Sequence, residues 1–366
     1  MNYNEFFQGK KIYVYGYNNL GRNAYRKMKE MYFDNVKGIL VLEHNKRTLE
    51  AKKKQKKILE LSEIYLQKDS SICIIVAFSL YEEMVKDLKD KGFENVIAYT
   101  IELDNWVNKN LKKLPYLETR ILVVCVGQAC NLKCRDCANF APYAHKENLR
   151  YKIEDIKADL DKIIPYFSEI DTLQIQGGEP FLYSDLSVLL RYIEVHFQHI
   201  IGNIQIATNG MIIPNQEILD ILNRGGIEVR ISNYKFQQNV KRLVELLEQK
   251  HIFYRKYNFA GKKGEWSLAG DIDYKDSSEE NLYEKVVNCK WNGCYTVENG
   301  MVGRCSRSIP ARTLQNISIK ETDYLNLKET IRLERVGQYF MFINPMDCCR
   351  HCKGSNGEPV QAAIQL

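Results

Sequence analysis

Short apolar runs alternate with stretches of helical periodicity in the N-terminal third of the chain. The apolar runs, which predict strands, are residues 11–15, 38–42, 72–78 and 95–99, and the clearest helical patterns are residues 20–31 and 79–91. Strand–helix alternation of this kind predicts a parallel sheet covered by helices. We therefore expect a Rossmann-like parallel-sheet domain over residues 1–115, with a joint to the next domain over residues 102–119.

A second alternation begins at Ile121. Its predicted strands are residues 121–126, 172–176, 203–208, 227–232 and 252–259, and its predicted helices are residues 153–167, 185–197, 215–224 and 236–250. Strands and helices in strict alternation over about 140 residues are typical of a parallel barrel or open barrel. On such folds the chemistry lies in the loops after the C-terminal ends of the strands. From Gly261 onward the periodicity is lost, and we expect irregular structure.

Composition places the chain among ordinary globular proteins. Hydrophobic residues make up 45% and charged residues 27% of it, which excludes disordered and collagen-like proteins. The longest apolar run, residues 72–78, is far shorter than the roughly 20 residues of a membrane helix. The first residues lack the basic start and apolar core of a secretory signal. We therefore expect a cytoplasmic protein without a membrane partner.

The net charge of +6 is modest for 366 residues, and much of it lies in the run Lys46–Lys57. A run of this kind favours a solvated helix face. Nucleic-acid binding would need interleaved aromatic residues or a known reader motif, and neither is present. We expect no nucleic-acid partner.

The cysteines are more informative than the charges. The chain has 11 of them, and they are unevenly spread: four lie within residues 125–137 and six within residues 289–352. In a reducing compartment such clusters indicate metal or iron–sulfur ligands rather than disulfides.

The first group contains the triplet Cys130, Cys134 and Cys137, spaced C-x3-C-x2-C directly after the first predicted barrel strand. Three thiolates in so short a loop can bind three irons of a cubane cluster and leave the fourth iron open for a small ligand. A zinc knuckle is the alternative at this point, although zinc usually takes four ligands from paired sites.

Polar and glycine-rich motifs follow the next three predicted strands. They are Gly177-Gly178-Glu179-Pro180, Thr208-Asn209-Gly210 and Ser232-Asn233. Glycine lets the backbone approach a ligand closely, and free carbonyl groups can accept an ammonium group. Together with the triplet, these ordered strand-end motifs resemble those of the radical S-adenosylmethionine (SAM) superfamily.

The resemblance implies an α/β fold with a partial (β/α)6 radical SAM barrel over residues 120–260. It also implies a 4Fe–4S cluster on Cys130, Cys134 and Cys137, whose open iron chelates SAM. Reduction of that cluster, by a flavodoxin- or ferredoxin-type donor, would cleave SAM to a 5′-deoxyadenosyl radical that abstracts a hydrogen atom. The SAM-binding residues implied by the family pattern are Gly177, Gly178, Glu179, Pro180, Asn209, Ser232 and Asn233.

One position departs from the family pattern. The residue before the third cysteine is often an aromatic that lies by the adenine, whereas here it is Asp136. Phe140 or Tyr143, just beyond the triplet, are the candidates to supply that packing.

The second cysteine group also resembles a known pattern of this superfamily. Cys289, Gly300 and Cys305 fit C-x10-G-x4-C, the opening of the SPASM and twitch extensions, which hold auxiliary 4Fe–4S clusters. The resemblance implies a cysteine-rich twitch/SPASM-like domain over residues 261–366, with a second 4Fe–4S cluster on Cys289, Cys305, Cys349 and Cys352. Cys294 and Cys348 are spare, and either could exchange with its neighbour. A structural zinc site is the alternative.

A glycine turn lies between the first strand and the first helix of the N-terminal domain. Gly16, Gly21 and Arg22 resemble a degenerate nucleotide-binding turn, and Glu43 follows the second strand, where an acidic residue often meets a ribose. The middle glycine of G-x-G-x-x-G is missing, so this domain either binds a nucleotide or substrate handle or binds none.

The combined resemblance implies a radical SAM oxidoreductase, of dehydrogenase or epimerase type, acting on a sugar, cyclitol or nucleotide-linked sugar. The cysteine plan most resembles that of a twitch-type dehydrogenase of an aminocyclitol. An epimerase would need a hydrogen donor, for which Cys294 or Cys348 is a candidate. The alternative is a peptide-modifying maturase that makes thioether, crosslink or formylglycine products. A non-catalytic or RNA-directed iron–sulfur protein would leave the strand-end motifs unexplained.

Overall fold

The computed structural model describes residues 2–43, 58–67, 69–78, 81–111, 117–234, 237–258, 266–270, 274, 280–314, 323–341 and 346–366. The predicted basic run 46–57, and parts of the predicted joint and of the strand ending at Phe259, lie outside these ranges. The chain forms two compact units. Unit 1 comprises residues 1–115 and 341–343, and unit 2 comprises residues 116–340 and 344–366.

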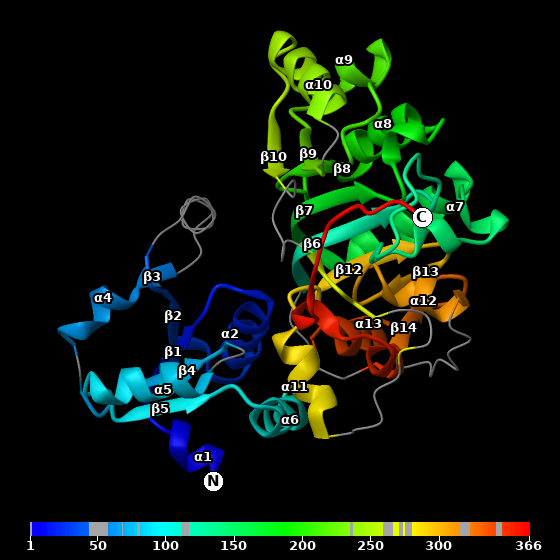
Figure 1. Ribbon diagram of the computed structural model, residues 1–366. Coiled ribbons are helices and arrows are strands. Elements are labelled where there is room, and N and C mark those ends of the chain that lie inside the picture. The colour runs from blue at the N-terminus through cyan, green and yellow to red at the C-terminus, as the bar shows by residue number, and fades with distance from the viewer. Residues whose placement is uncertain are drawn as a thin grey trace. The chain divides into compact units, whose positions relative to one another are not determined.

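Unit 1 contains the parallel sheet predicted from the sequence (Figure 1). Its strands are β1 (Lys11–Tyr15), β2 (Val36–Val41), β3 (Ile58–Glu60), β4 (Ile72–Val76) and β5 (Asn95–Ala98). They pair in the order β3-β2-β1-β4-β5, and every pair is parallel. This order places the C-terminal ends of β1 and β4 side by side, where open α/β sheets bind ligands.

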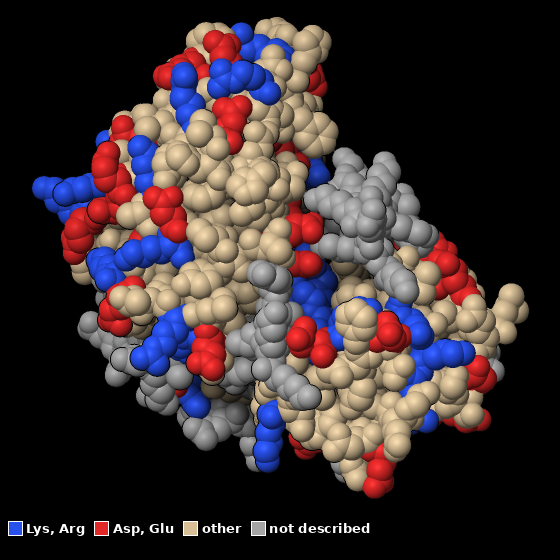
Figure 2. Space-filling model, turned by 180° about the vertical axis from the view of Figure 1, so that it is seen from behind, with Lys and Arg blue, Asp and Glu red and all other residues tan. Residues whose placement is uncertain are grey.

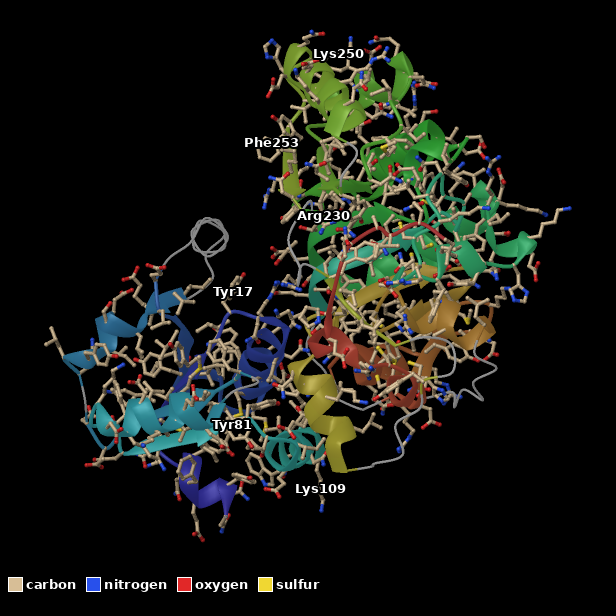
Figure 3. The ribbon with its side chains drawn as sticks, in the orientation of Figure 1. Tyr17, Tyr81, Lys109, Arg230, Lys250 and Phe253 are labelled. Atoms are coloured by element: carbon tan, nitrogen blue, oxygen red, sulfur yellow. The ribbon has the colours of Figure 1, made fainter. Side chains whose placement is uncertain are left out.

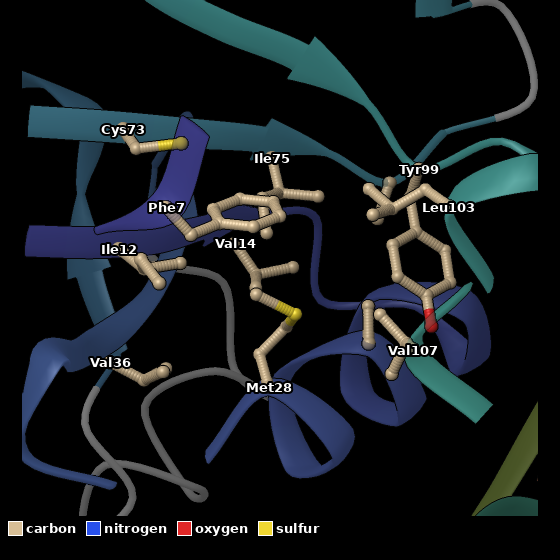
Figure 4. Close-up of a cluster of buried hydrophobic side chains, with 12 residues drawn as sticks. Phe7, Ile12, Val14, Met28, Val36, Cys73, Ile75, Tyr99, Leu103 and Val107 are labelled. Atoms are coloured by element: carbon tan, nitrogen blue, oxygen red, sulfur yellow. The ribbon is translucent and has the colours of Figure 1, made fainter. Parts of the chain in front are cut away.

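The helices of unit 1 are α1 (Tyr3–Phe7), α2 (Asn19–Tyr32), α4 (Leu61–Tyr65), α5 (Tyr81–Asp90) and α6 (Ile101–Asn110). Figure 4 shows the core in which α1, α2 and α6 meet the sheet, with Phe7, Val14 and Met28 fully buried. The predicted joint over residues 102–119 contains the boundary between the two units, after Pro115, but its first half is not a linker. Its first part is α6. The buried residues Leu103 and Val107 of this helix stand among mostly polar residues, so the sequence shows no clear apolar pattern there.

Unit 2 contains an eight-stranded sheet in the order β10-β9-β8-β7-β6-β12-β13-β14. Its first five strands in the chain are β6 (Leu117–Cys125), β7 (Phe167–Gln176), β8 (Ile204–Thr208), β9 (Glu228–Asn233) and β10 (Tyr254–Asn258), all paired in parallel. The helices between them are α7 (Ile153–Ile163), α8 (Leu186–Phe197), α9 (Gln216–Arg224) and α10 (Gln237–Gln249). The predicted α/β alternation of an open parallel barrel is confirmed (Figure 1).

Two strand starts and one helix end differ from the prediction. β6 begins at Leu117 and β7 at Phe167, several residues earlier than expected, and α7 ends at Ile163 instead of Phe167. Leu117 and Phe167 are partners in the ladder between these two strands. The extra length is stabilised by pairing between segments 50 residues apart, which local periodicity does not report.

The expectation of irregular structure after Gly261 is also wrong in part. β12 (Cys294–Glu298) pairs in parallel with β6 and is followed by β13 (Met301–Gly303) and β14 (Tyr324–Asn326), both antiparallel to their neighbours. The helices here are α11 (Glu280–Asn288), α12 (Ser308–Leu314) and α13 (Leu333–Met341), and β11 (Trp266–Ser267) pairs with β15 (Pro359–Val360). A sixth parallel strand therefore joins the barrel sheet, beside its first strand.

None of the helices in the described ranges combines the length and the apolar character that crossing a bilayer requires. On the face shown in Figure 2, Lys and Arg side chains are interspersed with Asp and Glu side chains.

Candidate active site and iron–sulfur ligands

The segment after β6 forms a loop that is closed at its base. The amide of Gln128 donates to the carbonyl of Asn148 (2.8 Å), and the amide of Ala129 donates to the carbonyl of Leu149 (2.9 Å). We call residues 130–147 the cluster loop. Its base is fixed at the C-terminal end of β6, where the fold is expected to place chemistry.

The three cysteines of the triplet lie together in the cluster loop. Cys134 is buried, and Cys130 and Cys137 are half-buried. The amide of Leu132 donates to the sulfur of Cys130 (3.4 Å). Burial raises the pKa of Cys130 to about 12, with smaller contributions from the neighbouring thiols. Three close thiolates need nearby positive charge, which iron supplies, so this donor set fits a cluster with one open iron.

The glycine motif after β7 lies directly against the start of the cluster loop. Gly178 donates its amide to the carbonyl of Gly127 (2.9 Å), and Glu179 donates to that of Ala129 (2.8 Å). A Cβ on Gly178 would lie 2.3 Å from the carbonyl oxygen of Ala129, so no other residue fits without movement. Within the described ranges nothing donates to the carbonyl oxygens of Gly177 and Gly178. These oxygens can therefore accept the ammonium group of SAM.

Both carboxylate oxygens of Glu179 accept hydrogen bonds from the protein itself. Its Oε1 accepts from the hydroxyl of Thr208 (2.8 Å) and the amide of Phe181 (3.2 Å), and its Oε2 accepts from the amide of Asn209 (2.8 Å). Burial raises the pKa of Glu179 to about 7, while these hydrogen bonds lower it. The side chain thus joins the ends of β7 and β8, and Pro180 continues this turn as the first residue of a short 3-10 helix.

Asn209, at the end of β8, reaches the cluster loop. Its side-chain amide donates to Oδ1 of Asn131 (2.8 Å) and approaches the sulfur of Cys130 at 3.8 Å. The predicted SAM-binding residues after β7 and β8 are therefore gathered at the cluster loop.

Ser232 and Asn233 are adjacent in β9, so their side chains point to opposite faces of the sheet. The hydroxyl of Ser232 accepts from Arg230 (3.3 Å), whose guanidinium lies 4.6 Å from the ring centre of Tyr257. Figure 3 labels Arg230 on this strand. Asn233 instead donates to Oδ1 of Asn258 (2.8 Å). The side chains of the two residues predicted together thus lie on opposite faces of the sheet.

The two aromatic candidates for adenine packing differ in availability. Phe140 is only 3% exposed and packs against Ala311, Met346 and Cys348. Tyr143 is 38% exposed. The ring of Phe140 is therefore used inside the protein, and Tyr143 is the one that a ligand can reach.

Five of the six C-terminal cysteines line one pocket, which we call the auxiliary pocket. These are Cys289, Cys305, Cys348, Cys349 and Cys352, with Arg307 also in the wall. Cys294 is absent from this wall. It begins β12, where burial raises the pKa of its thiol and the nearby Arg120 lowers it.

Cys348 differs in its surroundings from the other four cysteines of the pocket, which are Cys289, Cys305, Cys349 and Cys352. The pKa of Cys305 is raised by burial and then by the thiols of Cys349, Cys289 and Cys352. Cys348 hydrogen-bonds to Cys349, which raises the pKa of Cys348 and lowers that of Cys349. Cys348 also packs against apolar side chains. In the described ranges, no three Cys, His, Asp or Glu side chains converge as closely as a single metal ion requires.

Two positions of the site were missed from the sequence alone, Gln365 and Arg307. Gln365 lies in an antiparallel bridge with Cys134, and Figure 1 shows its segment in red, running toward β6 and α7. Its side chain accepts from the amide of Lys133 (2.7 Å) and donates to the sulfur of Cys134 (3.3 Å). These partners are more than 230 positions apart in the chain, so no local signal exists.

Replacing Gln365 with glutamate is expected to make the cluster on the triplet harder to reduce. The carboxylate keeps the acceptor for Lys133 but loses the donor to Cys134 and adds a negative charge, both of which disfavour the reduced cluster. A redox titration followed by electron paramagnetic resonance (EPR) should show a more negative midpoint potential. Gln361→Glu makes the same change at an exposed position of the same segment, and it should leave the potential unchanged.

Comparison with known proteins assigns the central part of the chain. Residues 124–245 match the family model of the Radical SAM superfamily. The chain carries a radical SAM domain. Enzymes of this superfamily use a 4Fe–4S cluster and SAM, which are therefore the cofactors of this domain. The triplet, the glycine motif and Asn209 all lie within the matched residues.

Individual proteins resemble this chain over a limited length or at low sequence identity. A GTP 3′,8-cyclase from Campylobacter jejuni subsp. doylei is 32% identical over 127 residues, which is 33% of this chain and 35% of the cyclase. Among solved structures, BtrN in complex with AdoMet and 2-DOIA is 17% identical, with a TM-score of 0.45 and coverage of 68% of this chain and 97% of BtrN. Native anSMEcpe with bound AdoMet is 13% identical, with a TM-score of 0.43 and coverage of 67% of this chain and 93% of anSMEcpe. The match to the cyclase spans about a third of either protein.

Replacing Gly178 with alanine is expected to weaken SAM binding at least about tenfold, or 1.4 kcal/mol. The added Cβ would press on Ala129 and displace the carbonyl groups that face the ligand. Equilibrium dialysis with SAM measures the change, and iron content should stay the same because the three cysteines are unaltered. Gly225→Ala, at a position with ordinary helical backbone after α9, is the control. Unaltered affinity in Gly178→Ala would refute this placement of SAM.

Proposed function

We propose that the protein is a radical SAM oxidoreductase, of dehydrogenase or epimerase type, that acts on a sugar, cyclitol or nucleotide-linked sugar. The observation that carries the proposal is the auxiliary pocket, whose wall contains five cysteines in the same unit as the triplet Cys130, Cys134 and Cys137. A second cluster there, on Cys289, Cys305, Cys349 and Cys352, would be fully cysteine-ligated. It could then exchange electrons but not bind SAM.

The residues divide the work between them. Cys130, Cys134 and Cys137 hold the first cluster, and the carbonyls of Gly177 and Gly178 orient the amino group of SAM. When bound, the cluster and SAM supply a 5′-deoxyadenosyl radical, which takes one hydrogen atom from a carbon of the substrate. For an alcohol carbon, the oxidation would be complete when the hydroxyl proton passed to solvent and the remaining electron passed to a second cluster, which Cys289, Cys305, Cys349 and Cys352 would hold. This gives a carbonyl product and one 5′-deoxyadenosine per SAM.

An epimerase would instead return a hydrogen atom to the carbon radical from a thiol. Of the two spare cysteines, Cys294 suits this role better, since Cys348 packs against Phe140 and Met346 inside the protein. Cys294 stands outside the wall of the auxiliary pocket and near Arg120.

A small-molecule substrate is favoured over a peptide by the relative that shares 32% identity with this chain. Its name denotes an enzyme that acts on GTP, a phosphorylated small molecule. The alternative remains a peptide-modifying maturase with the same radical step on a side chain.

We propose in addition that unit 1 binds the nucleotide or phosphate handle of the substrate. Gly16 has φ +131° after β1, and a Cβ on Gly21 would lie 1.9 Å from the carbonyl oxygen of Gly16, so this turn requires glycine at both positions. Asn18 caps α2 by accepting from the amide of Gly21 (2.8 Å) and donates to the carbonyl of Ala77 (2.8 Å). Hydrogen exchange of the 16–22 amides should slow when a nucleotide sugar is added. Unchanged exchange would contradict this role.

The test of substrate class is transfer of deuterium to 5′-deoxyadenosine. Reconstituted protein is incubated with SAM, a reduced flavodoxin and ring-deuterated nucleotide sugars or cyclitols. Deuterium in 5′-deoxyadenosine together with a carbonyl product supports a dehydrogenase, and solvent deuterium in an inverted product supports an epimerase. Transfer only from a deuterated peptide would overturn the proposal in favour of a maturase.

A further inference from the structure

Arg307 lies between the two groups of cysteines. It follows Cys305 by two residues and lines the auxiliary pocket. On its other side, its guanidinium lies 3.9 Å from the ring centre of Phe140, three residues after Cys137 in the cluster loop. The side chain is only 3% exposed. One buried cation thus touches the walls of both proposed cluster sites.

Backbone carbonyls hold this guanidinium in place. Its Nη2 donates to the carbonyl of Gly270 (2.7 Å), and its Nη1 donates to that of Ala138 in the cluster loop (3.4 Å). Its Nε is buried without a hydrogen-bond partner among the described residues. Leaving a buried donor unsatisfied costs about 1–3 kcal/mol, and more for a charged group. The buried Nε of Arg307 therefore lowers the stability of the folded protein.

No ion pair to a described Asp or Glu offsets the charge of Arg307. A buried cation without a counter-charge is unfavourable. The cysteines around it come from both sets: Cys305, Cys348 and Cys352 share the pocket wall with Arg307, and Cys137 lies three residues before Phe140. When these thiols bind iron as thiolates, they become its counter-charge.

We infer that Arg307 is a positioning residue that couples the two iron–sulfur clusters. It fixes the cluster loop against the auxiliary pocket, and its charge favours the reduced state of both clusters. The inference rests on the second cluster of the proposed function. It adds a residue that sets how easily the donor reduces the first cluster and how readily the second takes the substrate's electron.

Lysine cannot reproduce both parts of this role. The planar guanidinium lies over the ring of Phe140 while its two terminal nitrogens reach two carbonyls, whereas an ammonium group is a point charge on a flexible stem. Lysine at this position would therefore keep the charge and lose the geometry. Glutamine would keep one donor and lose the charge.

The experiment compares Arg307→Gln and Arg307→Lys in the anaerobically reconstituted full chain. EPR-monitored redox titration gives both potentials, and added SAM identifies the first cluster because only that cluster has an open iron. Arg350→Met is the matched control, since Arg350 lies beside Cys349 but pairs with Asp347 (3.6 Å). Iron content shows whether each variant still holds its clusters.

We expect Arg307→Gln to shift both potentials to more negative values, Arg307→Lys to shift them less, and Arg350→Met to leave the first cluster unchanged. If Arg307→Gln fails to hold iron, near-native potentials in Arg307→Lys still support the role of the charge. About eight irons with both potentials unmoved in Arg307→Gln would overturn this inference alone. About four irons in the wild type would instead overturn the second cluster, and the coupling with it.

Discussion

Replacing Cys130, Cys134 and Cys137 together with alanine is expected to reduce SAM cleavage to the level of a protein-free control. In the proposed site these three thiols would hold the cluster, and its open iron would bind SAM. Dithionite-reduced wild-type protein should release 5′-deoxyadenosine from SAM even without substrate. Liquid chromatography of the anaerobic reaction measures the difference.

The matched control is Cys73→Ala, which removes a thiol from the apolar core of unit 1. Burial raises the pKa of Cys73 to about 12, and no other cysteine lies in that unit. This variant should cleave SAM as the wild type does. Equal release of 5′-deoxyadenosine by the triple variant and the wild type would sink the assignment of the triplet.

The strand-end motifs were predictable from the sequence because of a property of parallel sheets. Consecutive parallel strands end at the same edge, so residues after β6, β7 and β8 must meet whatever the intervening helices do. The contacts of Gly178, Glu179 and Asn209 with the cluster loop and with one another follow from this rule. The local sequence was therefore enough to predict that these strand-end residues lie together at the cluster loop.

The rule does not extend to features that depend on the direction of a side chain or on a distant partner. Ser232 and Asn233 were predicted as a pair, but a strand turns successive side chains to opposite faces. β12 was missed because five residues show little periodicity and their partner strand lies more than 170 positions earlier. Gln365 and Arg307 were missed for a related reason: each acquires its role only when its distant segment folds against the cluster loop.

The residues that were not predicted have one feature in common: they hydrogen-bond to the cluster loop or to its base. Arg307 and Gln365 both direct N–H groups toward the cluster loop, one to a backbone carbonyl and one to the sulfur of Cys134. Glu298, at the end of β12, accepts from Gln128 and Tyr151 (2.8 Å each) at the base of the loop. The C-terminal part of unit 2 thus holds the loop from several sides. A cysteine loop that must bind a cluster in one geometry needs such support.

Iron counting on the triple-alanine variant is expected to find about four irons per chain in a 4Fe–4S species, because the auxiliary pocket has five cysteines in its wall and a cluster needs four. Mössbauer spectroscopy measures both the count and the cluster type. Adding Cys305→Ala to the triple variant should remove most of this iron, since Cys305 lines the auxiliary pocket together with the other proposed ligands. Adding Cys294→Ala instead should leave the iron in place, because Cys294 is not part of the pocket wall. Zinc without iron in the triple variant would reduce the auxiliary pocket to a structural metal site, and an oxidation would then lack its electron acceptor.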